Sequence, residues 1–122
     1  MIEKIEIEGI HLEVDDNMRR YVLRKIGRLD KYLPKHAKES AHAEVMLKNT
    51  DDKTNHATCE VTLFLPKETI NVHESTINIY AAIDIVEAKL KHRIQKYKDL
   101  HTSVKFSRHL IGKFRKKAAQ NF

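Results

Sequence analysis

The chain has 122 residues, of which 41% are hydrophobic and 33% charged, so it has the length and composition of one folded domain and is neither disordered nor fibrous. A single cysteine, Cys59, excludes an internal disulfide and a multi-cysteine zinc site, and the lack of a long apolar run or a secretory leader indicates a cytoplasmic protein without a membrane span. The net charge of +6 is uneven, because residues 16–35, 78–98 and 99–122 carry +5, +3 and +5 and leave −7 for the remainder. This segregation predicts one basic and one acidic surface.

The first half of the chain is predicted to form a strand followed by a helix. Apolar residues alternate with glutamates over residues 2–8, which is the period of a half-buried strand, and we expect Gly9 to end it. Either Asp15 or Asp16 is a suitable N-cap for the helix that follows. Apolar residues then recur at helical spacing as far as Pro34, at Met18, Val22, Ile26, Leu29 and Leu33.

The second half of the chain is predicted to form three strands and another helix. Alternating segments at 43–47 and 57–65 flank a polar cluster at 49–55, which predicts a hairpin. A short turn at Pro66-Lys67 leads to a strand near 68–74. From there the apolar period changes from two residues to the helical spacing, so residues 78–98 are predicted to form an amphipathic helix with Asn78 as its cap.

The predicted element order is β-α-β-β-β-α. Four strands with one apolar face each and two helices with one apolar stripe each are best satisfied by an α+β two-layer sandwich. We therefore expect a four-stranded sheet with both helices on one face, formed by a domain over residues 1–98. The basic residues 99–122 would then be a C-terminal tail that is flexible when unbound.

Cationic side chains gather on the faces of both predicted helices that point away from the core. Two rows of cations are suited to a ribose-phosphate backbone, because each neutralised phosphate releases condensed counterions. The open face of the sheet offers only Phe64 as an aromatic platform, so we expect the helices to bind RNA or DNA. The candidate contacts are Arg20, Arg24, Lys25, Arg28 and Lys31 on the first helix, and Lys89, His92, Arg93 and Lys96 on the second.

The sequence gives less support to an enzyme or a metalloprotein than to a nucleic-acid-binding protein. Cys59 is in register with inward-facing apolar residues of its strand, which predicts a buried structural thiol and not a nucleophile. The histidines at 42, 56 and 73 lie on the polar sides of three strands, but no ligand spacing is diagnostic of a metal. We assign no catalysis, no metal and no cofactor.

Several segments resemble the ribosome hibernation promoting factor family over residues 1–98. These segments are Tyr80-Ala81-Ala82-Ile83-Asp84 followed by Lys89-Leu90, then Lys96-Tyr97-Lys98, and Arg28-Leu29-Asp30-Lys31-Tyr32 at the end of the first helix. The resemblance implies a fold like that of double-stranded-RNA-binding domains. It also implies a protein that occupies the small ribosomal subunit's channel over the messenger and transfer RNA sites, and silences idle ribosomes under stress or in stationary phase.

By the same resemblance, the family's basic positions fall on Lys25, Arg28, Lys31, Lys89 and Lys96. The chain departs from the family's frequent Lys-Leu-Glu-Arg-Gln, since it reads Lys-Leu-Lys-His-Arg over residues 89–93. The 24 residues after 98 are too few for the pairing domain of long family members, so we expect a short form that is a monomer when free. The expected partners are the small subunit, its rRNA and whole ribosomes, and the alternative is a free-standing double-stranded-RNA-binding module.

Overall fold

The computed structural model describes residues 1–49 and 56–101. They form four strands, three α-helices and one 3₁₀ helix. In chain order these are β1 (Lys4–Ile10), α1 (Asp16–Gly27), the 3₁₀ helix η1 (Arg28–Tyr32), α2 (Lys35–Lys38), β2 (His42–Asn49), β3 (Ala57–Leu65), β4 (Glu68–Thr76) and α3 (Ile79–His101).

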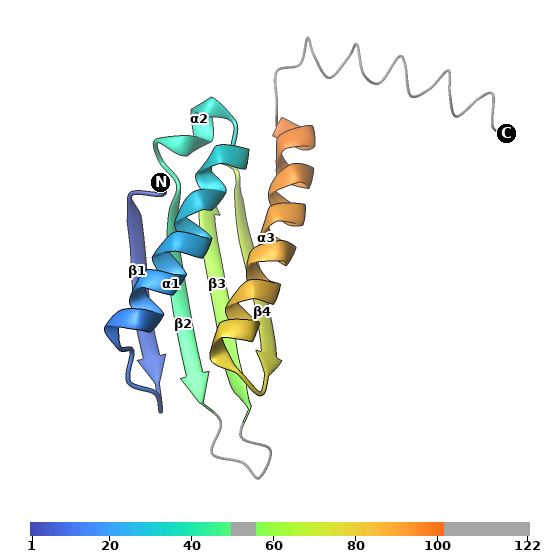
Figure 1. The fold of residues 1–122 in the computed structure, drawn as a ribbon. Helices are drawn as coiled ribbons and strands as arrows, with labels where there is room; N and C mark the ends of the chain where they lie inside the picture. The colour runs from blue at the N-terminus through green and yellow to red at the C-terminus, as the bar shows by residue number, and fades with distance from the viewer. Residues whose placement is uncertain (50–55, 102–122) are drawn as a thin grey trace, which may run out of the picture.

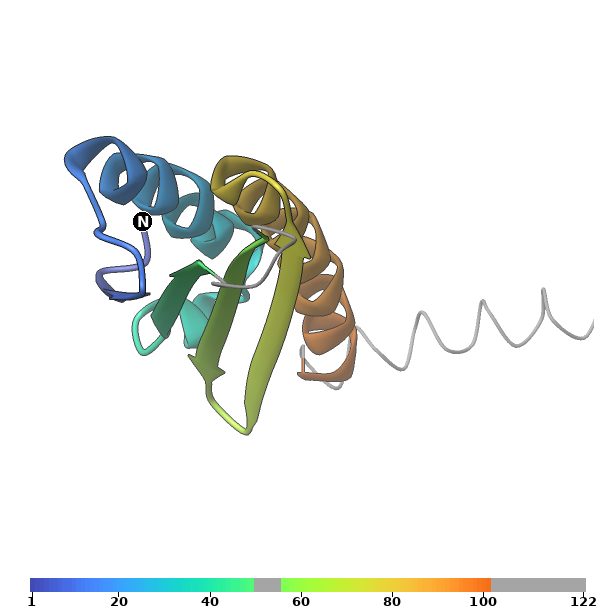
Figure 2. The same cartoon turned by 90° about the horizontal axis from the view of Figure 1, so that it is seen from below.

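The four strands form one sheet in the order β1-β2-β3-β4. β1 pairs with β2 in parallel, whereas β2 with β3 and β3 with β4 are antiparallel hairpins. α1 and α3 lie side by side on one face of this sheet, with α3 packed on β3 and β4 (Figure 1). Seen along the strands, both helices are on the same side and the other face of the sheet is open (Figure 2). The predicted two-layer sandwich is therefore confirmed.

The core lies between the sheet and the two long helices, where the apolar faces of the strands and helices meet. Alternate residues of β2 and β3 point inward, and Val45, Val61 and Cys59 are almost fully buried. From the helices, Ile26 and Leu90 meet this face with no exposed surface. Removing apolar surface from water is the main favourable term in folding, so the alternating strands and helical stripes specify this packing.

The first strand and the turn after it differ from the sequence prediction. β1 continues through Gly9 to Ile10, and the chain turns at His11, whose φ is 53°. Gly9 is needed for the turn itself, because a Cβ there would lie 2.2 Å from the carbonyl oxygen of Leu12. Its role is to let the next segment approach the strand, and not to end the strand.

The first helix begins as predicted but is shorter than the sequence suggests. The Asp15 carboxylate accepts a hydrogen bond from the backbone N–H of Met18 at 2.8 Å, so Asp15 is the N-cap. The predicted helix to Pro34 is wrong, since α-helical geometry ends at Gly27 and continues as the tighter η1. Gly27 is buried against Met1, and a Cβ there would lie 2.7 Å from the Met1 methyl carbon. The four-residue α2 was not predicted.

The C-terminal helix is longer than the sequence suggests. The Asn78 side chain accepts a hydrogen bond from the backbone N–H of Tyr80 at 2.8 Å, which confirms the predicted cap. α3 then runs to His101, three residues beyond the expected end at 98. Near that end the Tyr97 hydroxyl donates to the carbonyl of Pro66 at 2.8 Å and ties the helix to the β3–β4 turn. The predictions for the hairpin loop at 50–55 and for the tail beyond residue 101 lie outside the described residues.

Candidate nucleic-acid interface

The solvent side of α1 carries two exposed arginines one helical turn apart, Arg20 and Arg24. The guanidinium of Arg24 lies over the ring of Tyr21, with 5.2 Å between the guanidinium carbon and the ring centroid. This contact orients the arginine without neutralising its charge, because the partner is an uncharged π-system. Neither arginine has a carboxylate partner among residues 1–49 and 56–101, so both are available to an external anion.

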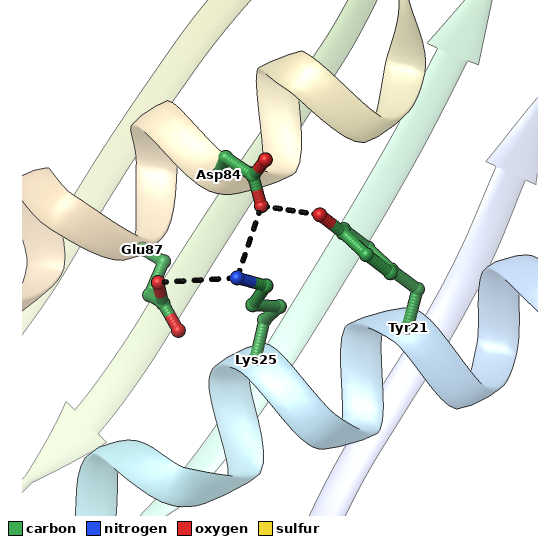
Figure 3. A network of polar contacts seen from close by, with 4 residues as sticks. All are labelled: Tyr21, Lys25, Asp84 and Glu87. Atoms are coloured by element: carbon green, nitrogen blue, oxygen red, sulfur yellow. Dashed lines mark hydrogen bonds and ion pairs between the residues drawn. The ribbon is translucent and has the colours of Figure 1, made fainter.

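Lys25 has a different environment, because it lies at the contact between α1 and α3. Its ammonium is 3.4 Å from a carboxylate oxygen of Asp84 and 4.0 Å from one of Glu87 (Figure 3). The Tyr21 hydroxyl donates to the same Asp84 at 2.5 Å. This hydrogen bond, with burial, raises the pKa of Tyr21 to about 12. The network joins the two helices and offsets the charge of Lys25, so this lysine is less available to an external anion than Arg20 and Arg24.

The predicted cations of α3 lie on the side of that helix away from α1. α3 faces α1 with Tyr80, Asp84 and Glu87, whereas Lys89 pairs with Glu74 of β4. The hydrogen bond from Lys89 is the main cause that lowers the pKa of Glu74. The two rows of cations are therefore separated by the helix contact, and do not face each other across a single channel.

A broad groove of about 760 Å³ separates this flank of α3 from the edge strand β4. Its walls include Lys89, His92 and Arg93 from the helix and residues 71–73 from the strand, and the half-exposed Ile85 provides apolar surface. Lys96 is exposed one turn further along α3. Three of these four predicted contacts thus line one groove, with cationic groups beside an apolar surface.

A second cationic cluster joins η1 to α3, and part of it was missed by the sequence reasoning. Arg28, Lys31 and Tyr32 line a hollow of about 240 Å³ together with Lys91 of α3, which was not a predicted contact. The ammonium groups of Lys31 and Lys91 lie 5.1 and 4.8 Å from the centroid of the Tyr32 ring. A usable signal was present in the sequence, because Lys91 follows Tyr80, Asp84 and Glu87 at helical spacing on one side of α3.

The open face of the sheet has the opposite charge. Glutamates from three adjacent strands line a shallow hollow there, at Glu6, Glu8, Glu44 and Glu60. On the same face, the rings of His42 and Phe64 stack with 4.5 Å between their centroids. The acidic sheet face and the cationic helix side give the described part of the chain the two surfaces expected from the charge distribution.

The environment of Cys59 does not favour chemistry. The side chain is fully buried, as predicted, and burial raises the pKa of its thiol to about 12. A thiolate nucleophile requires the opposite shift and an accessible sulfur. Within the described ranges no three His, Cys, Asp or Glu side chains are placed to hold a metal ion. None of the helices in those ranges has a stretch both long and apolar enough to span a membrane.

Comparisons with known proteins agree with this architecture. Residues 5–102 match the family described as Sigma 54 modulation protein / S30EA ribosomal protein. The chain is 40% identical over 95 residues to the ribosome hibernation promotion factor of Lactococcus lactis subsp. cremoris (strain MG1363), and 34% identical over 96 residues to that of Staphylococcus aureus (strain COL). Each alignment covers 78% of this chain but 49% and 48% of the relatives, so the chain spans about half the length of the curated relatives it matches.

Two solved structures share the fold. The Thermus thermophilus Protein Y N-terminal domain superposes with a TM-score of 0.68 at 29% identity, covering 77% of this chain and 98% of that one. A ribosomal subunit interface protein from Coxiella burnetii superposes with a TM-score of 0.64 at 20% identity, covering 78% of this chain and 97% of that one. The second likeness, at this low identity, supports the fold alone.

Proposed function

Because the chain belongs to the Sigma 54 modulation protein / S30EA ribosomal protein family, we propose that it is a ribosome hibernation factor. It binds small-subunit rRNA in the channel used by messenger and transfer RNA and blocks translation by occupancy. Its relatives are named for ribosome hibernation, and we expect the chain to act under stress or in stationary phase. The proposed activity is binding alone and includes no covalent step.

The observation that carries the proposal is a set of cations on the helix side that have no carboxylate partner. Lys25 and Lys89 are paired within the protein, whereas the six other lysines and arginines among the predicted contacts have no ion pair among residues 1–49 and 56–101. An unpaired cation binds phosphate without first breaking an internal ion pair, so its whole charge contributes to counterion release. These six are Arg20, Arg24, Arg28, Lys31, Arg93 and Lys96.

The distribution of charge also orients the domain. A glutamate-lined sheet face is repelled by an RNA surface, while the opposite side is attracted to it. A channel whose walls are rRNA therefore favours one orientation, with α1, η1 and α3 toward the phosphates. A folded domain held in that position would exclude messenger and transfer RNA by volume alone.

Sedimentation with vacant ribosomes through a sucrose gradient tests the proposal. The chain should migrate with small subunits or whole ribosomes, and an Arg28→Gln/Arg93→Gln/Lys96→Gln variant should remain near the top. The matched control, Arg19→Gln/Lys35→Gln/Lys38→Gln, removes the same charge from exposed positions outside the predicted contacts and should migrate like the wild type.

A competition with naked duplex RNA separates ribosomal binding from general RNA binding. A ribosome hibernation factor should stay on the subunits in the presence of excess duplex RNA. If the duplex removes the chain as effectively as unlabelled subunits do, the protein is a free-standing double-stranded-RNA-binding module and the ribosomal proposal fails.

A further inference from the structure

The hollow between η1 and α3 gathers cations from two elements around one aromatic ring. Lys31 belongs to η1 and Lys91 to α3, and each ammonium lies about 5 Å from the centre of the Tyr32 ring. The two nitrogens are therefore within about 10 Å of each other. Neither lysine has a carboxylate partner in the described part of the chain. Two like charges in this position repel each other until an anion lies between them.

The 3₁₀ geometry of η1 brings a third cation to the same place. Side chains three residues apart are eclipsed in a 3₁₀ helix, whereas in an α-helix they are offset by about 60°. Arg28 and Lys31 are three residues apart in this segment, and both line the hollow. The end of α-helical geometry at Gly27 thus aligns two cations toward Lys91.

The one acidic group in the hollow does not neutralise these cations. Glu87 lines the hollow, but its carboxylate is 4.0 Å from the ammonium of Lys25, which is a further lining residue. The pair of Lys25 and Glu87 is close to neutral, so Arg28, Lys31 and Lys91 leave a charge of +3 in a space of about 240 Å³. At about 30 Å³ for each water molecule, that space holds about eight waters and has room for a phosphate group.

The Tyr32 hydroxyl supplies a hydrogen-bonding group in the hollow. Its pKa is lowered, mainly by hydrogen bonding with Lys91, and also by Lys31. A phenol beside two ammonium groups donates well to a phosphate oxygen, while lysine binds phosphate as a point charge and arginine as a planar fork.

From this arrangement we propose that Arg28, Lys31, Tyr32 and Lys91 form a discrete phosphate-binding site. The phosphate comes either from the RNA backbone or from a free phosphate compound. The choice of an rRNA phosphate rests on the proposed function, whereas the site itself does not.

Titration of the free protein with inorganic pyrophosphate, followed by heteronuclear NMR, tests the site. We expect saturable one-to-one binding that is weakened at least about tenfold in Lys31→Gln and in Lys91→Gln, because each removes a charged hydrogen bond. Lys91→Arg should keep most of the affinity. The control Lys38→Gln, an exposed lysine of α2 outside the hollow, should bind within about twofold of the wild type.

A spectrophotometric titration of tyrosine gives a second readout at the site. A phosphate between the lysines counteracts their effect on the phenol, so pyrophosphate should move the ionisation of Tyr32 to higher pH. Tyr32→Phe should abolish this change. If Lys91→Gln leaves pyrophosphate affinity unchanged, or Lys38→Gln reduces it equally, the proposed site is wrong.

Sedimentation of Lys91→Gln with vacant ribosomes identifies the source of the phosphate. Weaker co-migration than that of Lys38→Gln assigns the site to an rRNA phosphate, and unchanged co-migration assigns it to a free phosphate compound. If wild-type protein binds pyrophosphate through Lys91 but does not bind ribosomes, the proposed function fails while the phosphate site stands.

Discussion

Replacing Arg20, Arg24 and Arg28 with glutamine should halve the salt dependence of ribosome binding. These arginines are exposed and have no carboxylate partner in residues 1–49 and 56–101, so the fold should not depend on their charges. Together they are half of the six unpaired cations that we propose to meet phosphates. Three glutamine substitutions at Arg19, Lys35 and Lys38 provide the control.

The magnitude follows from counterion release. Six neutralised phosphates give a slope of log affinity against log salt of about −4 to −5, at about 0.7 to 0.9 for each phosphate. With a slope of about −5, a rise from about 50 to 200 mM salt weakens binding about 10³-fold. With half that slope the same rise weakens it only about 30-fold. The variant should therefore bind more weakly at low salt and approach the wild type as salt increases.

Fluorescence anisotropy of labelled protein with vacant small subunits, at constant magnesium and varied potassium chloride, measures both slopes. The control should keep the wild-type slope, because its substitutions lie outside the contact. An unchanged slope in the arginine variant would mean that these arginines of α1 and η1 do not meet phosphates and would refute their assignment as contacts.

Three further predictions concern the fold and its titration. Asp15→Ala removes the N-cap hydrogen bond and should cost about 0.5–2 kcal/mol in urea unfolding, and a variant as stable as the wild type would mean that the cap is not stabilising. Tyr97→Phe leaves the Pro66 carbonyl without its donor and should cost about 1–3 kcal/mol, whereas a neutral change would mean that water replaces the hydroxyl. Because burial raises the pKa of Cys59 to about 12, the contribution of its neutral thiol to stability is complete below about pH 8.5 and is lost as the pH rises toward the folded value. Between about pH 8.5 and 10 the wild type should lose about 1.5 kcal/mol more than Cys59→Ala, and parallel pH profiles of the two proteins would contradict the burial of an ionisable thiol.

The fold could be predicted from the sequence wherever one face of an element is apolar. Apolar residues alternate every second residue around Cys59 and Val61, and they recur at helical spacing through Leu90. A two-layer sandwich buries all of these apolar faces. The end of α1 at Gly27 could not be predicted, because the apolar spacing of the helix continues at Leu29 in η1. The four residues of α2 are too short to show a helical period.

The candidate interface was predictable as a set of residues but not as a geometry. A helical wheel places cations on the outside of each helix, but it does not show which flank faces a neighbouring element. The pairing of Lys89 with Glu74 depends on β4 lying beside α3, and the pairing of Lys25 with Asp84 depends on the helix contact. Helical spacing places Lys91 on the same side of α3 as Asp84 and Glu87, but its closeness to Lys31 depends on η1 lying beside α3.

Cryo-electron microscopy of a vacant small subunit saturated with the chain tests the proposed position and orientation of the domain directly, because its two faces differ so clearly in charge. The expected result is α1, η1 and α3 against rRNA phosphates within the messenger and transfer RNA channel, with the glutamate-lined face of the sheet directed away from RNA. Density showing the domain outside that channel, or with the sheet face against rRNA, would contradict it.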